Sequence, residues 1–147
     1  MTNLTSQEKL YAGIQMTRPL LRYITSRVET DLKGTGISVG QRAILEVLFA
    51  VGKATAPEIT RYLDVKRQFV GREVKEMENL GLVDSEPNPN HKSSKIYTLT
   101  AKSRPIIESI RAREVTQIGA FAERFSKAEI SAFHKIQSAL LAEFSPD

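Results

Sequence analysis

Four pairs of residues near expected helix starts share one local signal: a Ser or Thr followed three residues later by a Glu or Gln. This pattern is typical of a capping box, in which the hydroxyl accepts a hydrogen bond from a free backbone N–H at a helix start and the later side chain accepts one from the cap residue. The last three pairs each precede apolar residues at the helical period, so they predict where helices begin. The pairs are Thr5 with Glu8, Ser38 with Gln41, Thr55 with Glu58, and Ser126 with Glu129.

Helix-ending residues extend these starts into helices. The first helix is expected to run to about Lys33, and Pro19 must either kink it or mark its true start, because proline removes a helix hydrogen bond. The second helix should follow Ser38 and end near Gly52. A short third helix should span about 55–63, and a fourth, about 66–80, should be closed by Gly81, a residue type that readily turns left-handed at a helix end.

After the fourth helix the apolar pattern changes to one typical of strands. Leu82–Glu86 and Lys95–Thr100 are short, and the second is rich in β-branched and aromatic residues. The segment 87–94 between them is polar and contains two prolines, which indicates a hairpin loop. Two long helices finish the chain, one beginning near Thr100 or Ser103 and the other after Ser126. Three helices followed by a two-stranded wing is the element order of a winged helix-turn-helix.

The predicted fold class is therefore mainly α with a small β-hairpin wing, in a single domain over 1–147, since about 100–200 residues make one domain. The outer helices are too few to form a separate core, so we expect them to pair with those of a second copy. The alternative, that they fold back on their own domain, stays open. The expected parts are dimerisation helices at about 5–34 and 101–145, and a winged helix-turn-helix at about 38–100, with the helix-turn-helix at about 55–80 and the wing at about 82–100.

Composition excludes several classes of protein. Hydrophobic residues make up 41% and charged residues 26%, close to the usage of ordinary globular domains, which argues against wholesale disorder. The longest run free of charged and strongly polar side chains, Val47–Gly52, is far short of a membrane span. The chain has no cysteine, which excludes disulfides, thiolate metal sites and thiol sensors. Because its start lacks a signal-peptide pattern, we expect a cytoplasmic protein without a membrane partner.

Charge points to the fourth helix more than to the chain as a whole. With 21 Lys and Arg against 17 Asp and Glu, the net charge of +4 is only a mild indication of a polyanionic partner. At about 100° per residue, the core side of the fourth helix should carry Val70, Val74, Met77 and Leu80. The opposite side carries hydrogen-bond donors and no acid, namely Gln68, Arg72, Lys75 and Asn79, with Gly71 beside them.

The start of the same helix favours an anion. Lys66, Arg67 and Arg72 precede three glutamates, the reverse of the order that the helix dipole favours. Lys66 is also a poor cap where Ser or Thr would satisfy the backbone. A phosphate at this end would be bound by free N–H groups and basic side chains together. Arg and Lys pair with guanine, and Gln and Asn with adenine, in the major groove, so the helix is predicted to contact double-stranded DNA.

Over roughly residues 18–104 the chain resembles the MarR-type transcriptional regulators. The likeness rests on Ile37-Ser38-x-x-Gln41, Glu58-Ile59-x-x-Tyr62-Leu63, Val74-x-x-Met77-Glu78-x-x-Gly81-Leu82-Val83, and the wing from Pro87 to Thr100. This resemblance implies a homodimer built from terminal helices, a recognition helix in each of two major grooves, and wings on the flanking minor grooves. It further implies a repressor that is relieved by a small aromatic or anionic effector.

The wing departs from the family pattern. The family's wing usually carries an Asp that braces an Arg two positions on, whereas these positions here are His91 and Ser93. Gly71 stands where relatives often have Ser, Thr or Gln. The predicted DNA-binding residues are Thr55, Lys66, Arg67, Gln68, Gly71, Arg72, Lys75, Asn79, His91, Lys92, Ser93 and Lys95, and the predicted effector pocket comprises Arg18, Arg22 and Tyr23.

Two other classes of function compete with DNA binding. The two histidines, His91 and His134, lack metal-binding spacing, and no Gly-rich loop opens a helix after a strand, so we expect no catalytic residue, metal or cofactor. The alternative left open is a dimeric winged-helix protein–protein interaction module without DNA binding. The altered wing favours that module, and the acid-free face of the fourth helix counts against it.

Overall fold

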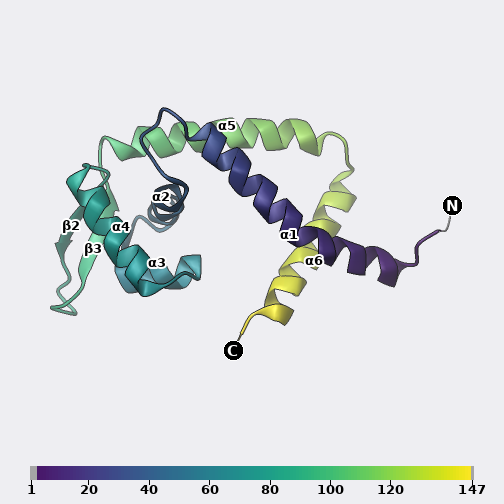
Figure 1. Cartoon of the computed structure of the whole chain (residues 1–147), viewed down its shortest axis with the longest axis horizontal. Helices are drawn as coiled ribbons and strands as arrows, with labels where there is room; N and C mark the ends of the chain where they lie inside the picture. Colours follow the sequence, from purple (N-terminus) through teal and green to yellow (C-terminus); the bar gives the residue numbers. More distant parts are fainter. Residues whose placement is uncertain (1–2, 147) are drawn as a thin grey trace. The chain divides into compact units, whose positions relative to one another are not determined.

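The computed structural model describes residues 3–146, so residues 1, 2 and 147 of the predicted domain lie outside it. These residues form two compact units, one ending at Ile107 and the other beginning at Glu108, and α5 contributes to both. The described chain contains six helices and a small antiparallel sheet, which confirms the predicted fold class (Figure 1). The elements are α1 (Ser6–Asp31), α2 (Val39–Val51), β1 (Lys53–Thr55), α3 (Ala56–Leu63), α4 (Arg67–Asn79), β2 (Val83–Pro87), β3 (Lys95–Leu99), α5 (Ser103–Ala122) and α6 (Lys127–Phe144).

Local hydrogen bonds account for the helix starts. Complete capping boxes form at Ser38, Thr55 and Ser126, and at Thr5 the hydroxyl accepts the Glu8 N–H at 3.1 Å. Pro19 lies inside α1, so it does not mark the start of that helix, one of the two options that the sequence left open. None of the helices in the described part of the chain has the length and apolar run that a membrane crossing needs.

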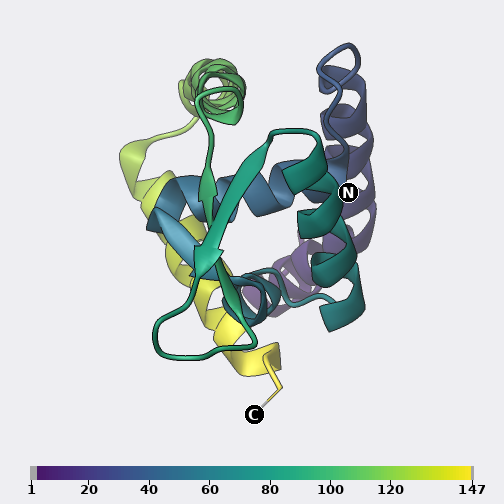
Figure 2. The ribbon, with the colours of Figure 1, turned by 90° about the vertical axis from the view of Figure 1, so that its left-hand side faces the viewer.

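The sheet has one strand more than the sequence predicted. β2 and β3 form the expected hairpin, with Val83 opposite Leu99 and Pro87 opposite Lys95. β1 pairs with the other edge of β3, which gives the order β1-β3-β2. A strand of three residues is too short for its alternation to be recognised, and it was therefore missed. Because β1 leads directly into α3, it attaches the helix-turn-helix to the wing (Figure 2).

The core of the first unit lies between α2, α3, α4 and the sheet. Val70, Val74 and Met77 are buried as predicted, whereas the prediction that Leu80 is a core residue was wrong, since its side chain is 43% exposed. The helix ends at this point: Gly81 adopts a φ of 73°, and the Leu82 N–H donates to the Met77 carbonyl at 2.8 Å. The Gly81 N–H donates to the Glu78 carbonyl, which completes a Schellman motif and turns Leu82 into the core in place of Leu80.

Candidate nucleic-acid interface

The exposed face of α4 carries the donors that the sequence placed there. Val70, Val74 and Met77 are buried on the opposite side of the helix, and this fixes the orientation of α4 against the rest of the first unit. We call the outward residues the α4 stripe; they are Gln68, Arg72, Lys75 and Asn79, all exposed. Because each side chain is long or carries a planar amide or guanidinium, the stripe can donate hydrogen bonds to base edges or phosphates.

The turn before α4 sets where that helix begins. Asp64 ends α3 in the left-handed conformation, with a φ of 52°, which Asp tolerates better than most residues. Lys66 is the N-cap of α4 and makes no side-chain cap hydrogen bond, unlike the caps of α2, α3 and α6. The first backbone N–H groups of a helix have no partner within that helix. With Lys66 and Arg67 both exposed beside them, this end of α4 can accept an anion.

Two further predicted contacts have different surroundings. Thr55 is buried, and its hydroxyl accepts from the Glu58 N–H at 3.3 Å while donating to the Glu58 carboxylate at 2.9 Å. This hydroxyl is therefore engaged in the α3 cap, and the structure does not bring it to the α4 stripe. At Gly71, a Cβ built on the backbone would meet no atom within 4 Å. The glycine therefore answers no packing need within the described chain.

The wing retains a contact between the two positions that depart from the family pattern. The His91 Nδ1 lies 2.9 Å from the Ser93 hydroxyl and 3.2 Å from that of Ser94, a residue that the sequence did not single out. His91, Lys92 and Ser93 are all exposed. Figure 2 shows their loop beyond the ends of β2 and β3. The wing tip therefore carries Lys92 and a hydrogen-bonded histidine, where the family pattern has an Asp and an Arg.

A second group of polar residues joins the wing to α4. The Ser85 hydroxyl donates to the Glu78 carboxylate at 2.5 Å, and the Lys95 ammonium lies 4.0 Å from the other Glu78 oxygen. The pKa of Tyr97 is raised above its ordinary value, first by burial and second by the negative charge of Glu78. The sequence predicted Lys95 as a DNA contact but gave no role to Glu78, Ser85 or Tyr97, because their proximity depends on how the hairpin packs.

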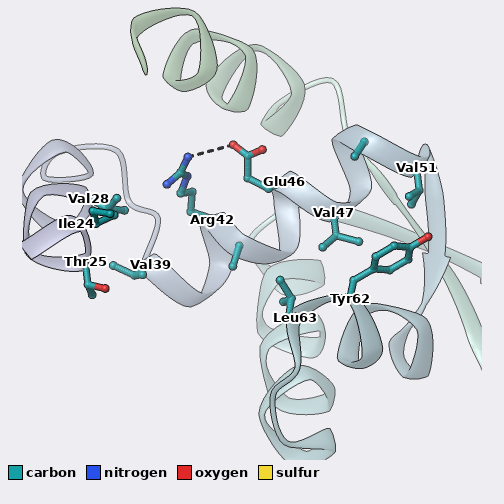
Figure 3. A pocket seen from close by; sticks show the side chains of 12 residues that line it. Ile24, Thr25, Val28, Val39, Arg42, Glu46, Val47, Val51, Tyr62 and Leu63 are labelled. Carbon is teal, nitrogen blue, oxygen red and sulfur yellow. Dashed lines mark hydrogen bonds and ion pairs between the residues drawn. The ribbon is translucent and has the colours of Figure 1, made fainter. Parts of the chain in front are cut away.

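An open cavity of about 580 Å³ lies between α1, α2 and α3 (Figure 3). This volume is within the range of about 300–1,000 Å³ that small-molecule pockets occupy. Its wall is mostly apolar and includes the Arg42–Glu46 ion pair, at 3.3 Å. The lining residues are Ile24, Thr25, Val28, Val39, Arg42, Ala43, Glu46, Val47, Ala50, Val51, Tyr62 and Leu63.

The predicted effector residues lie elsewhere on α1. Arg18, Arg22 and Tyr23 are exposed, and none of them lines the cavity. The Arg22 guanidinium instead lies 5.5 Å from the centre of the Tyr23 ring, a cation–π distance. The α1 residues that line the cavity are Ile24, Thr25 and Val28, all beyond Tyr23 along the helix (Figure 3).

Known proteins resemble the chain in sequence and in structure. A sequence model described as the MarR family matches residues 35–92. The crystal structure of the MarR family transcription regulator SP03579 is 43% identical, covers 94% of this chain and 91% of its own, and has a TM-score of 0.86. FabT of Streptococcus pneumoniae, whose structure is a complex with DNA, is 18% identical, covers 90% of this chain and 95% of its own, and has a TM-score of 0.78.

Curated relatives match a shorter stretch. Uncharacterized proteins of Mycobacterium tuberculosis and Mycobacterium bovis are 30% identical over 78 residues, which are 53% of this chain. The match spans about half the length of these relatives, 54%. The likeness to FabT supports the fold, and the likeness to SP03579 extends over nearly the whole chain at higher identity.

Proposed function

Because the chain belongs to the MarR family of transcription regulators, we propose that it is a sequence-specific repressor that binds double-stranded DNA with α4 in the major groove. The observation that carries this proposal is the α4 stripe, an exposed row of donors without an acid on a helix whose other side is buried. FabT, which shares the fold, was solved in complex with DNA, and this supports DNA as the ligand in the proposal. The proposal assigns no catalytic residue, metal or cofactor.

The contacts divide into two kinds, because base contacts specify a sequence and phosphate contacts position the protein. In the proposal Gln68, Arg72, Lys75 and Asn79 face base edges from the α4 stripe. Lys66 and Arg67 bind phosphate at the start of α4, and Gly71 lets the backbone approach the groove. In the wing, Lys92 and Lys95 bind phosphate beside His91 and Ser93 at the minor groove. Thr55 keeps a predicted role only through the backbone of the α3 start.

The active form in this proposal is a homodimer. The outer helices expose large apolar side chains in the single chain, which an association between copies would cover. A two-fold axis would present two copies of α4 to half-sites about one helical turn apart. The exposed residues include Leu20, Leu21 and Ile24 on α1, Val115 and Ile118 on α5, and Phe133 and Leu141 on α6.

Relief by a small effector is the remaining element of the proposal. The cavity between α1, α2 and α3 has an apolar wall that would accept an aromatic ring, and an anionic group would compete with Glu46 for the Arg42 guanidinium on that wall. Arg18, Arg22 and Tyr23 would then act at the exposed side of α1 rather than as cavity lining. A ligand that binds between α1 and the DNA-binding elements changes DNA affinity only if it binds one arrangement of these elements more tightly.

A second candidate, a dimeric winged-helix module that binds proteins, is favoured by the wing tip. His91 and Ser93 form a hydrogen-bonded pair, and the wing contains no arginine to enter a minor groove. The two functions differ in the role of the exposed cations of the α4 stripe. In a DNA-binding regulator these cations give a salt-dependent affinity for duplex DNA, whereas a protein-binding surface does not require such an affinity.

Selection from a library of random duplexes, followed by affinity measurements at two salt concentrations, tests the proposal. The regulator should enrich a sequence with two-fold symmetry and bind it more weakly as salt rises, because cations released from DNA drive the association. A scrambled duplex of equal length provides the control. A chain that enriches no sequence and shows no salt-dependent binding is not a DNA-binding regulator, and the protein-binding module would then be favoured.

A further inference from the structure

Glu78 connects α4 to both strands of the wing. It lies in the last turn of the helix and its side chain is 35% exposed. One carboxylate oxygen accepts the hydrogen bond from Ser85 on β2, and the other lies 4.0 Å from the ammonium of Lys95 on β3. A single side chain on the recognition helix thus contacts both arms of the hairpin.

The strand register explains why these residues meet. Ser85 lies directly opposite Tyr97, and Lys95 is two residues before Tyr97 on the same strand. Successive side chains of a strand point to opposite faces, so all three lie on one face of the hairpin. On β3 Lys95 is exposed, whereas Tyr97 and Leu99 are both buried in the core. Glu78 therefore reaches this row where the buried base of the wing gives way to its exposed part.

A carboxylate at this position opposes the binding of DNA. It repels phosphates near the α4 stripe, where Asn79 is the next residue. The negative charge of Glu78 also contributes to the raised pKa of Tyr97, although burial is the larger cause. The hydrogen bond from Ser85 stabilises the wing and so offsets the unfavourable effect of the Glu78 charge on DNA binding. It can do so because hydrogen bonds to ionised groups are stronger than those between neutral groups.

We propose that Glu78 is a positioning residue that holds the wing at a fixed separation from α4, so that the α4 stripe and Lys95 meet one duplex together. The inference rests on the proposed function for its DNA readout. Ser85 secures β2 through its hydroxyl, and the Glu78 charge keeps the Lys95 ammonium on the α4 side of the wing. Loss of the hydrogen bond would let the hairpin move, and the two contacts would no longer form at one spacing.

Two neutral variants separate position from charge. Glu78→Gln and Glu78→Ala remove the same negative charge, but only the glutamine retains an oxygen that can accept from Ser85. Ser85→Ala removes the donor and keeps the charge. Glu76→Gln, at an exposed acid on the same helix, is the matched control for charge removal away from the wing.

The first arm uses a duplex that the wild-type protein selects from a random library, with a scrambled duplex beside it. Glu78→Ala should bind the selected duplex roughly three- to tenfold more weakly than Glu78→Gln, the factor expected for one hydrogen bond. Ser85→Ala should weaken binding relative to wild type by a similar factor, and the double variant Glu78→Ala with Ser85→Ala should be no weaker than Glu78→Ala alone. Glu76→Gln should bind at least as tightly as wild type.

The second arm needs no DNA. Amide hydrogen exchange in β2 and β3 should be faster in Glu78→Ala and Ser85→Ala than in wild type and Glu78→Gln, with α2 unchanged in all four. If Glu78→Ala and Glu78→Gln coincide in both arms, Glu78 does not position the wing and the inference is overturned. If the wild-type protein selects no duplex, the proposed function fails. The hydrogen-exchange measurement alone then shows whether Glu78 holds the wing.

Discussion

Replacement of Gly71 by alanine should stabilise the protein. Gly71 lies inside α4, and a Cβ built there meets no atom within 4 Å, so the methyl group adds no contact and no clash. The change in unfolding free energy is then the difference in helix propensity, about 0.8–1.0 kcal/mol in favour of alanine. For a chain of 147 residues this corresponds to an increase in melting temperature of about 2–4 °C.

The matched control is Gly40→Ala, in the first turn of α2. A Cβ at this position would collide with the end of the Phe69 ring, which packs against α2 from α4. Forcing atoms into a packed site typically costs about 1–3 kcal/mol, more than the helix propensity returns. Gly40→Ala should therefore lower the unfolding free energy, while Gly71→Ala raises it.

The assay is urea or thermal unfolding followed by far-UV circular dichroism. Protomer concentration must be equal in all samples, because the stability of a dimer depends on concentration. A Gly71→Ala protein that is equally or less stable than wild type would refute the reasoning. That result would mean that the backbone at 71 is not an unobstructed helix interior, and the geometry of the α4 stripe would then have to be revised.

Three further predictions concern DNA contact, assembly and alkaline stability. Arg72→Ala should cost about 1–3 kcal/mol of binding free energy per contacted base and flatten the base preference at one position of each half-site. Lys92→Ala should instead weaken binding to all duplexes alike and reduce the salt slope by about one. Titrations of selected and scrambled duplexes would contradict this if Arg72→Ala weakened all duplexes alike and Lys92→Ala flattened the base preference. Phe133→Glu should disrupt the dimer and its folding together, and sedimentation that finds a folded wild-type monomer at micromolar concentration would oppose this. Because the pKa of Tyr97 is raised on folding, its contribution to stability is fully present below the unfolded pKa of about 10 and should be lost as pH rises through the folded pKa. Tyr97→Phe should remove this loss in urea unfolding measured between about pH 8 and 11. Equal dependence of stability on pH in both proteins would exclude this prediction.

The helices could be predicted because their signals are local. Ser38 and Gln41 satisfy each other within one turn, at 3.1 Å in both directions, whatever the rest of the chain does. The face of α4 followed from periodicity for the same reason. The prediction failed for Leu80 because the Schellman turn at Gly81 changes the direction of the chain within one residue.

The parts of the site that depend on packing could not be predicted. The pairing of β1 with β3 joins residues more than forty positions apart, and three residues carry no detectable alternation. The bond between Glu78 and Ser85 spans a helix end, a turn and the start of a strand, so no spacing rule indicates it. The role of Thr55 as a helix cap was visible in its spacing from Glu58, and this use of the hydroxyl competes with the DNA contact also predicted for it.

Two of the three acids of α4 turn away from its outward side, while the third, Glu76, is exposed. Glu73 accepts from the Gln41 amide of α2 at 3.4 Å, and Glu78 accepts from Ser85 of β2, so both carboxylates point to other elements of the first unit. Arg72 and Lys75 lie on the exposed side of the same helix. Hydrogen bonds therefore hold Glu73 and Glu78 toward the first unit, and burial of the apolar side of α4 leaves Arg72 and Lys75 facing outward. The field that a duplex would meet is determined by this arrangement, and a net charge of +4 over the whole chain conceals it.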